Sequence, residues 1–131
     1  MKNRLQTILI SFLVLTPFTI QASENQKTDH YEGKEFGTAE EARAALISTT
    51  QKMAAVINTD TLDVSKMEEV HQISYTTEDA LAVVAKHNDK HDFEALAEKL
   101  EAVHQASEHH KTDILAREFV VYQAELIKYL K

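Results

Sequence analysis

The chain has 131 residues, a formal net charge of −7, two glycines, one proline and no cysteine. This length is that of one domain, and the absence of cysteine excludes disulfides, thiolate metal sites, cysteine nucleophiles and covalently attached c-type haem. Two glycines are too few for a phosphate-binding loop, the scarcity of turn-forming residues disfavours an all-β fold, and the acidic excess argues against nucleic acid or an anionic membrane surface as a partner.

The N-terminal residues 1–22 have the layout of a secretory signal peptide. Lys2 and Arg4 give a positive start, an apolar run covers residues 8–20, and Ala22 is a small residue at the expected cleavage point. The run is interrupted by the chain's proline and is shorter than the roughly 20 apolar residues of a membrane-spanning helix. We therefore expect export to the periplasm and no attachment to a membrane once the signal peptide is removed.

The segment that follows, residues 23–37, is polar and holds both glycines, so we expect a flexible N-terminal arm. The remaining residues, 38–131, contain neither glycine nor proline, which is a helical composition. Thr38 and Glu41 have the spacing of a capping box, in which the threonine hydroxyl accepts from the glutamate amide. The first helix is therefore predicted over residues 39–57.

Three more amphipathic helices are predicted in the rest of the chain. Ser65 opens a second capping box, and the helix that it starts ends near Lys86. Asp92 is the expected cap of the third helix and Thr112 that of the fourth. Each helix has apolar residues at helical spacing on one face, so the expected fold is all-α, an up-down-up-down four-helix bundle.

The last two helices have an alternative organisation, because no glycine or proline lies between residues 93 and 131 to separate them. They could form one continuous helix. Such a helix would be polar on every side at residues 108–113, and this favours two separate helices.

Two methionines and two histidines gather at one end of the predicted bundle. Met53 lies about one turn before the first helix ends, and His71 lies about one and a half turns into the second. His104 lies about one turn before the third helix ends, with Met67 close above this layer. The heights of these residues predict a ligand site formed by Met53, His71 and His104.

This residue set has a definite chemistry. Imidazole and thioether groups together suit copper, or a haem b with histidine and methionine as axial ligands. A metal site here would use His71, His104, Met53, Met67 and Glu118, with a carboxylate such as Glu118 orienting one imidazole; Glu78 is an alternative for that role. The opposing interpretation is that the methionines only fill the core and that no cofactor is bound.

Glu68 and His71 form a Glu-x-x-His motif that is repeated at Glu101 and His104. In a four-helix bundle this motif is typical of ferritin-like di-iron proteins. The helical wheel places both glutamates away from the inward face, and counting along an antiparallel helix pair separates the two motifs by about 12 Å. We therefore predict no di-iron site.

The stretch MEEVHQISYTTEDAL at residues 67–81, together with a short signal peptide and YEGK at residues 31–34, resembles an uncharacterised family of small proteobacterial periplasmic helical proteins. That resemblance implies export and a helical fold, but no activity. In size and topology the chain is also similar to small periplasmic b-type cytochromes, which bind haem with a methionine of the first helix and a histidine of the last. Met53 fits that pattern, but the fourth helix has no histidine, so His71 or His104 would have to replace it.

The expected function is that of a periplasmic binding protein that holds a metal ion or haem, and not that of an enzyme, because no strained nucleophile turn is present. The alternative is a structural or protein-interaction bundle, for example a stress-related one, without a cofactor. Such a protein would form a homodimer through the extra apolar residues of the last helix, Ala116, Val120 and Ile127.

Overall fold

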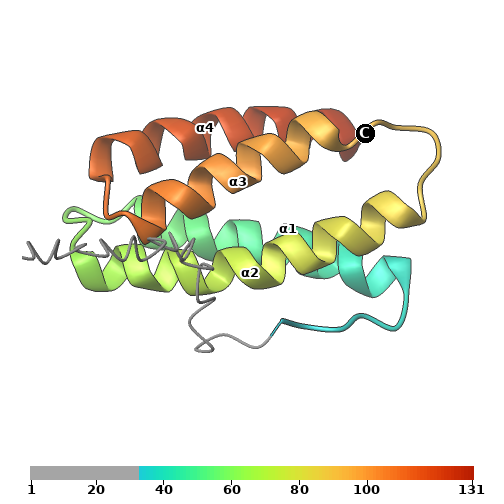
Figure 1. Cartoon of the computed structure of the whole chain (residues 1–131), viewed down its shortest axis with the longest axis horizontal. Helices are drawn as coiled ribbons and strands as arrows, with labels where there is room; N and C mark the ends of the chain where they lie inside the picture. The colour runs from blue at the N-terminus through green and yellow to red at the C-terminus, as the bar shows by residue number, and fades with distance from the viewer. Residues whose placement is uncertain (1–32) are drawn as a thin grey trace, which may run out of the picture.

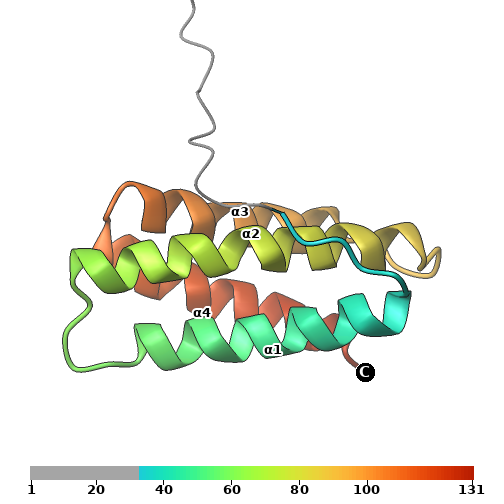
Figure 2. The ribbon, with the colours of Figure 1, turned by 90° about the horizontal axis from the view of Figure 1, so that it is seen from below.

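The computed structural model describes residues 33–131, which form four helices and no strand. The signal peptide predicted at residues 1–22 and most of the predicted arm lie outside these residues. The helices run antiparallel to their neighbours in the chain, and Figures 1 and 2 show two hairpins lying side by side. This confirms the predicted all-α four-helix bundle. The helices are α1 (Ala39–Ile57), α2 (Val64–Lys86), α3 (Glu94–Glu108) and α4 (Thr112–Tyr129).

The two hairpins are held together mainly through α2 and α3. Helix α1 packs extensively on α2, as α3 does on α4, whereas α1 and α4 approach each other at few points. Side chains of all four helices form the core, and its fully buried large members are mostly leucine, valine and aromatic residues. A functional site on the seam between α2 and α3 is therefore built from both halves of the molecule.

The first helix begins as predicted. The Thr38 hydroxyl accepts a hydrogen bond from the Glu41 amide at 3.1 Å. The Glu41 carboxylate reaches back to the amide of Gly37, at 3.0 Å, instead of the amide of Thr38. The capping residues are therefore confirmed, with one of the two bonds displaced by one residue.

The predicted cap of the second helix is wrong. Helix α2 begins at Val64, because Asp63 accepts from the Lys66 amide at 2.9 Å and so caps the helix before Ser65 can. An aspartate at this position also places negative charge at the positive end of the helix dipole, which a serine does not.

The predicted caps of α3 and α4 are both wrong. Asp92 accepts from the Glu94 amide at 2.9 Å, but it lies one residue before the N-cap position of α3, which Phe93 occupies without a side-chain cap bond. Thr112 does not cap α4: it is the first residue of that helix, and its hydroxyl donates to the Met67 sulfur at 3.6 Å. A thioether of the neighbouring hairpin thus takes the bond that was assigned to the local backbone.

A Schellman turn separates α3 from α4 and confirms two helices in place of one. His110 has φ of 52°, in the left-handed region that most residues avoid. The Lys111 amide donates to the Ala106 carbonyl at 2.9 Å, and the His110 amide donates to the Ser107 carbonyl at 3.2 Å. These are the two bonds that define this type of helix end.

The described part of the predicted arm is fixed to the bundle. Phe36 packs against the core. The Lys34 amide donates to Asp79 at 2.8 Å. A Cβ atom at Gly33 would lie 2.7 Å from the same carboxylate, so any larger residue there requires Asp79 to move. No helix among residues 33–131 is long and apolar enough to cross a bilayer.

One buried hydrogen bond links α1 to α4. The Thr50 hydroxyl and the Tyr122 hydroxyl are 2.8 Å apart. Thr50 donates its own proton to the Leu46 carbonyl, at 2.7 Å, so Tyr122 is the donor in this pair. Burial raises the pKa of Tyr122 to about 12.

We expect Thr50→Val to destabilise the protein more than Tyr122→Phe does. The valine leaves a buried tyrosine hydroxyl without an acceptor, at a cost of about 1–3 kcal/mol. The phenylalanine leaves Thr50 bonded to Leu46 and costs about 1 kcal/mol. Urea unfolding of both variants and the double variant measures these free energies, and equal or reversed costs would contradict the assigned donor.

Candidate metal centre between α2 and α3

Polar side chains of α2 gather on the face that meets α3. Four of them are spaced three, four and three residues apart, which places them along one side of a helix. The first and the last carry carboxylates, and the two between them carry aromatic rings. They are Glu68, His71, Tyr75 and Glu78.

Helix α3 brings a matching set to the same seam. Glu101, His104 and Glu108 are spaced three and four residues apart and therefore also share one side of their helix. Ser107 does not compete for the histidine ring, because its hydroxyl donates to the backbone carbonyl of His104 at 2.7 Å. The imidazole of His104 is thus presented to α2 between two carboxylates.

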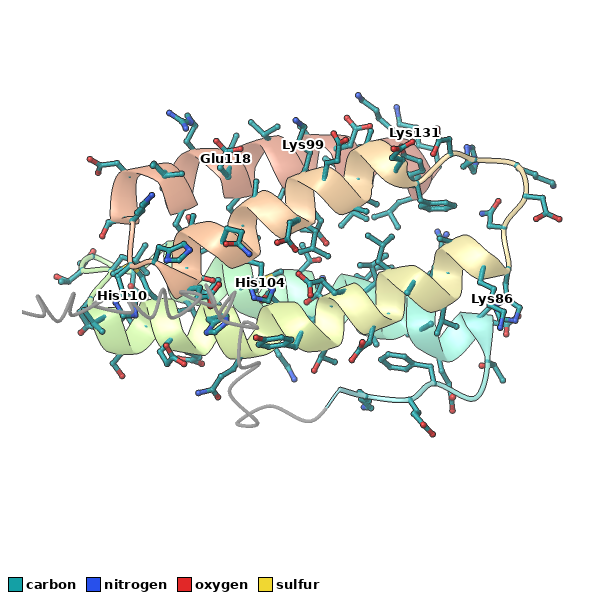
Figure 3. The ribbon with its side chains drawn as sticks, viewed as in Figure 1. Lys86, Lys99, His104, His110, Glu118 and Lys131 are labelled. Atoms are coloured by element: carbon teal, nitrogen blue, oxygen red, sulfur yellow. The ribbon has the colours of Figure 1, made fainter. Side chains whose placement is uncertain are left out.

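The three rings of the seam contact one another. The centroids of His71 and His104 are 4.8 Å apart in an edge-to-face arrangement, and that of Tyr75 lies 4.6 Å from His104 and 5.2 Å from His71. Both histidines are buried, with 5% and 7% of their surface exposed. Figure 3 shows His104 between the two ribbons. Two buried imidazoles in contact are a preorganised pair of nitrogen ligands.

Carboxylates of α2 orient both imidazoles through the same ring nitrogen. His104 Nδ1 lies 2.8 Å from the Glu78 Oε1 atom, within hydrogen-bond distance. His71 Nδ1 lies 3.5 Å from the Glu68 Oε1 atom. Such carboxylate–histidine pairs are typical of metal sites, where one ring nitrogen is held by the carboxylate and the other binds the ion.

The electrostatics of the seam favour a positive charge. Burial lowers the pKa of His104, but the hydrogen bond to Glu78 and the charges of Glu78, Glu101 and Glu108 outweigh it, so the pKa is raised above its usual value. Burial raises the pKa of Tyr75, and the nearby charges of Glu108, Glu78, Glu68 and Glu101 raise it further. Four carboxylates therefore act on the same small volume.

Two groups of three side chains bring potential ligand atoms close together. In one group a nitrogen each of His71 and His104 and an oxygen of Glu108 lie within 4.8 Å of one another. In the other, Glu78 and Glu101 surround His104 at similar distances. Ligand atoms bound to one ion at about 2.0–2.2 Å are separated by about 3–3.5 Å. Small side-chain rotations would therefore suffice to close either group around an ion.

The other predicted ligands lie in different surroundings. Met53 is fully buried in the hydrophobic core, and Met67, almost fully buried there too, accepts the hydrogen bond of Thr112 described above. Glu118 pairs with the neighbouring Arg117 at 2.9 Å. Figure 3 shows Glu118 on α4, well away from His104. The structure thus brings together the predicted histidines and places Glu78, the alternative to Glu118, at hydrogen-bond distance from His104.

Tyr75 and Glu108 were missed by the sequence interpretation, although their spacing from the histidines was visible. Each lies four residues after a histidine and so on the same side of its helix. The expected separation of about 12 Å between the Glu-x-x-His motifs was wrong, because the histidine rings are in contact.

These features define an all-α bundle with a buried histidine pair surrounded by carboxylates. The chain belongs to a family of unknown function (DUF6746), whose profile matches residues 1–130. This membership agrees with the expected resemblance to an uncharacterised family. The search of curated proteins found no match, and the search of solved structures found none either.

We expect the stabilising effect of Glu78 to depend on pH. The raised pKa of His104 means that the folded state favours the imidazolium, so this stabilisation is fully present below the usual histidine pKa of about 6.5 and is lost as pH rises through the raised value. In metal-free urea unfolding, Glu78→Gln should therefore lose more stability at about pH 5.5 than at about pH 8.5.

Glu98→Gln is the matched control for this experiment, because Glu98 is an exposed α3 glutamate outside both ligand groups. Its effect on the free energy of unfolding should be small at both pH values. An effect of Glu78→Gln that is equal at the two pH values, or larger at the alkaline one, would contradict the proposed ion pair with His104.

Proposed function

We propose that this protein binds one divalent transition-metal ion through His71, His104 and Glu108. The observation that carries the proposal is the contact of two buried imidazoles with a third ligand atom within 4.8 Å of both nitrogens. Two imidazoles and a carboxylate suit Zn²⁺, Cu²⁺, Ni²⁺ and Fe²⁺, and Cu²⁺ generally binds such sets most tightly. Glu68 and Glu78 orient the two rings.

The geometry supports an ion in preference to haem b. An axial pair of histidines has to enclose a planar macrocycle, whereas these two rings contact each other and Tyr75. The burial of Met53 and Met67 within the core supports a packing role for both methionines. A site of nitrogen and oxygen ligands favours Cu²⁺ or Zn²⁺ over Cu⁺, which prefers sulfur.

The proposed role is binding without catalysis, in an exported protein. Residues 1–22 would direct the chain to the periplasm, where a site with two neutral imidazoles can capture or buffer a metal ion. The bound ion also offsets the charge of the four surrounding carboxylates, which repel one another in the absence of a cation. Metal binding is therefore expected to stabilise the fold by mass action.

Calorimetric titration with Cu²⁺ and with Zn²⁺ should give one site per chain. Glu108→Gln should weaken the binding by about tenfold to a hundredfold, because it removes a ligand from the surface without opening the core. His104→Ala should weaken it at least as much. Affinity should also fall as pH drops through the raised pKa of His104, since protons compete with the metal for the imidazole.

The matched controls are Glu98→Gln and His109→Ala, which change exposed residues of the same helix and its end. Both should bind metal like the unaltered protein, and circular dichroism should show that all four variants remain helical. The site assignment fails if the controls lose as much affinity as Glu108→Gln and His104→Ala, and the function fails if neither metal binds stoichiometrically.

A second candidate function is protein interaction through α4. Val120 and Ile127 are seven residues apart and have 64% and 56% of their surface exposed, with Ile114 and Val121 exposed beside them. Apolar residues at this spacing form a stripe on one side of a helix, which is a common form of dimer surface. This stripe supports a homodimer with the same α4 face on both copies.

The mass measured by light scattering should accordingly rise with concentration toward that of a dimer. Val120→Lys with Ile127→Lys should keep the protein monomeric over the same range. Val64→Lys is the control, because Val64 is equally exposed but lies on α2, and it should leave the association unchanged. A constant monomer mass up to millimolar concentration would exclude this second function.

A further inference from the structure

A groove of about 660 Å³ runs between α2 and α3, from the histidine pair toward the link between these helices. It begins at Glu78 and Glu101 and ends at Asp92. Figure 1 shows the two ribbons diverging toward the link. The floor of the groove is apolar and consists of Leu81, Ala82, Ala85, Phe93, Ala97 and Leu100.

The far end of the groove is held in place by α4. The Phe93 ring stacks on the Tyr129 ring with 4.8 Å between centroids. The Tyr129 hydroxyl donates to the Asp92 carbonyl at 2.8 Å. Small alanines on both walls, together with this anchored end, keep the groove open, and its volume is within the range of small-molecule sites.

The rim of the groove carries charge of one sign. Among residues 33–131, all of its charged lining residues are acidic, and no lysine or arginine lines it. Two of the carboxylates, those of Glu78 and Glu101, offer oxygens within 4.8 Å of each other at the end next to His104. An apolar floor under an acidic rim is complementary to a ligand that joins hydrocarbon to a positive charge. The acidic residues are Glu78, Asp92, Glu94, Glu98 and Glu101.

We propose that the groove binds a small organic cation with an apolar body, an alkyl- or arylammonium compound. Its ammonium group lies between Glu78 and Glu101, and its hydrocarbon part covers Ala82, Ala97 and Phe93. Burial of that hydrocarbon drives binding, because apolar surface is removed from water. The carboxylate pair fixes the orientation of the ligand and rejects anions.

Charge also favours this ligand over the other possible occupants of the groove. The chain has 21 acidic and 14 basic residues, so a second copy would bring further negative charge to a rim that is already acidic. A fatty acid or an alkyl sulfate would place its anionic end against the same carboxylates. The groove requires no metal, so this inference stands apart from the proposed metal site.

The test is a titration with hexyltrimethylammonium, with hexyl sulfate as the anion of the same chain length. A chelator is present throughout, so the result does not depend on metal binding. Calorimetry should show saturable one-to-one binding of the cation and an affinity for the anion that is at least about tenfold lower. Lengthening the chain from butyl to octyl should raise the affinity, by up to about fourfold for each methylene.

Substitutions inside and outside the groove show where the cation binds. Ala97→Phe fills the groove from an exposed position on α3 and should lower the affinity for the cation about tenfold or more. Ala55→Phe makes the same change at an exposed position on α1, outside the groove, and should have no effect. Glu101→Gln should reduce the preference for the cation over the anion, without unfolding the protein, because Glu101 is exposed.

The proposal is overturned by equal affinity for the cation and the anion, by equal effects of the two phenylalanine variants, or by the absence of saturation. It is also overturned if the mass measured by light scattering doubles and Ala97→Phe restores the monomer, because the groove would then be occupied by a second copy. Methyl shifts of Ala82, Ala85 and Ala97 in nuclear magnetic resonance spectra distinguish a ligand in the groove from one elsewhere.

Discussion

The hydrogen bond between His104 Nδ1 and Glu78 Oε1 crosses the seam at which the two helical hairpins meet. Because α1 and α4 touch at few points, α2 and α3 carry most of the contact between the two halves. A partly buried polar pair at such a place favours one register of one helix against the other. The same register brings His71 and Tyr75 of α2 against His104 of α3 and leaves the apolar groove beyond Glu78.

The metal site and the groove share one wall. Glu78 holds His104 and also lines the groove, and Glu101 belongs both to the groove and to a potential ligand group. A positive charge bound at either place therefore acts on the other through these carboxylates. Two cations only a few ångströms apart repel each other, so the two proposed ligands are expected to weaken each other's binding.

Local patterns in the sequence predict the helices well and the site only in part. The absence of glycine and proline after Thr38 and the polar links define four helices, and α1 has the predicted bounds. The cap of α2 was misplaced, because Asp63 and Ser65 both have suitable side chains and only the path of the preceding loop decides between them. Spacing in the sequence shows which residues of one helix share a side. The partners of His104 belong to another helix, so they depend on how the two helices meet.

The predicted ligand set shows the same limit. Counting residues gives the height of a side chain along the bundle but not the direction in which the helix turns it. Met53 and Met67 share a layer with the histidines on that count, yet both belong to the core, and Glu118 faces away on α4. Glu108 and Tyr75 reach the site because α2 and α3 present these faces to each other, and no local pattern in either helix reveals that pairing.

The left-handed residue His110 has a consequence for assembly. Among residues 33–131 it is the one non-glycine residue with a positive φ, and a non-glycine residue in this conformation costs about 1–2 kcal/mol. A straightened α3–α4 helix avoids that cost but separates α4 from its own bundle. Two such chains can exchange their last helices and restore every α3–α4 contact in each other, which is domain swapping about a hinge at residues 109–111. The exchanged dimer would keep both histidine pairs, because His71, His104 and Glu108 all precede the hinge.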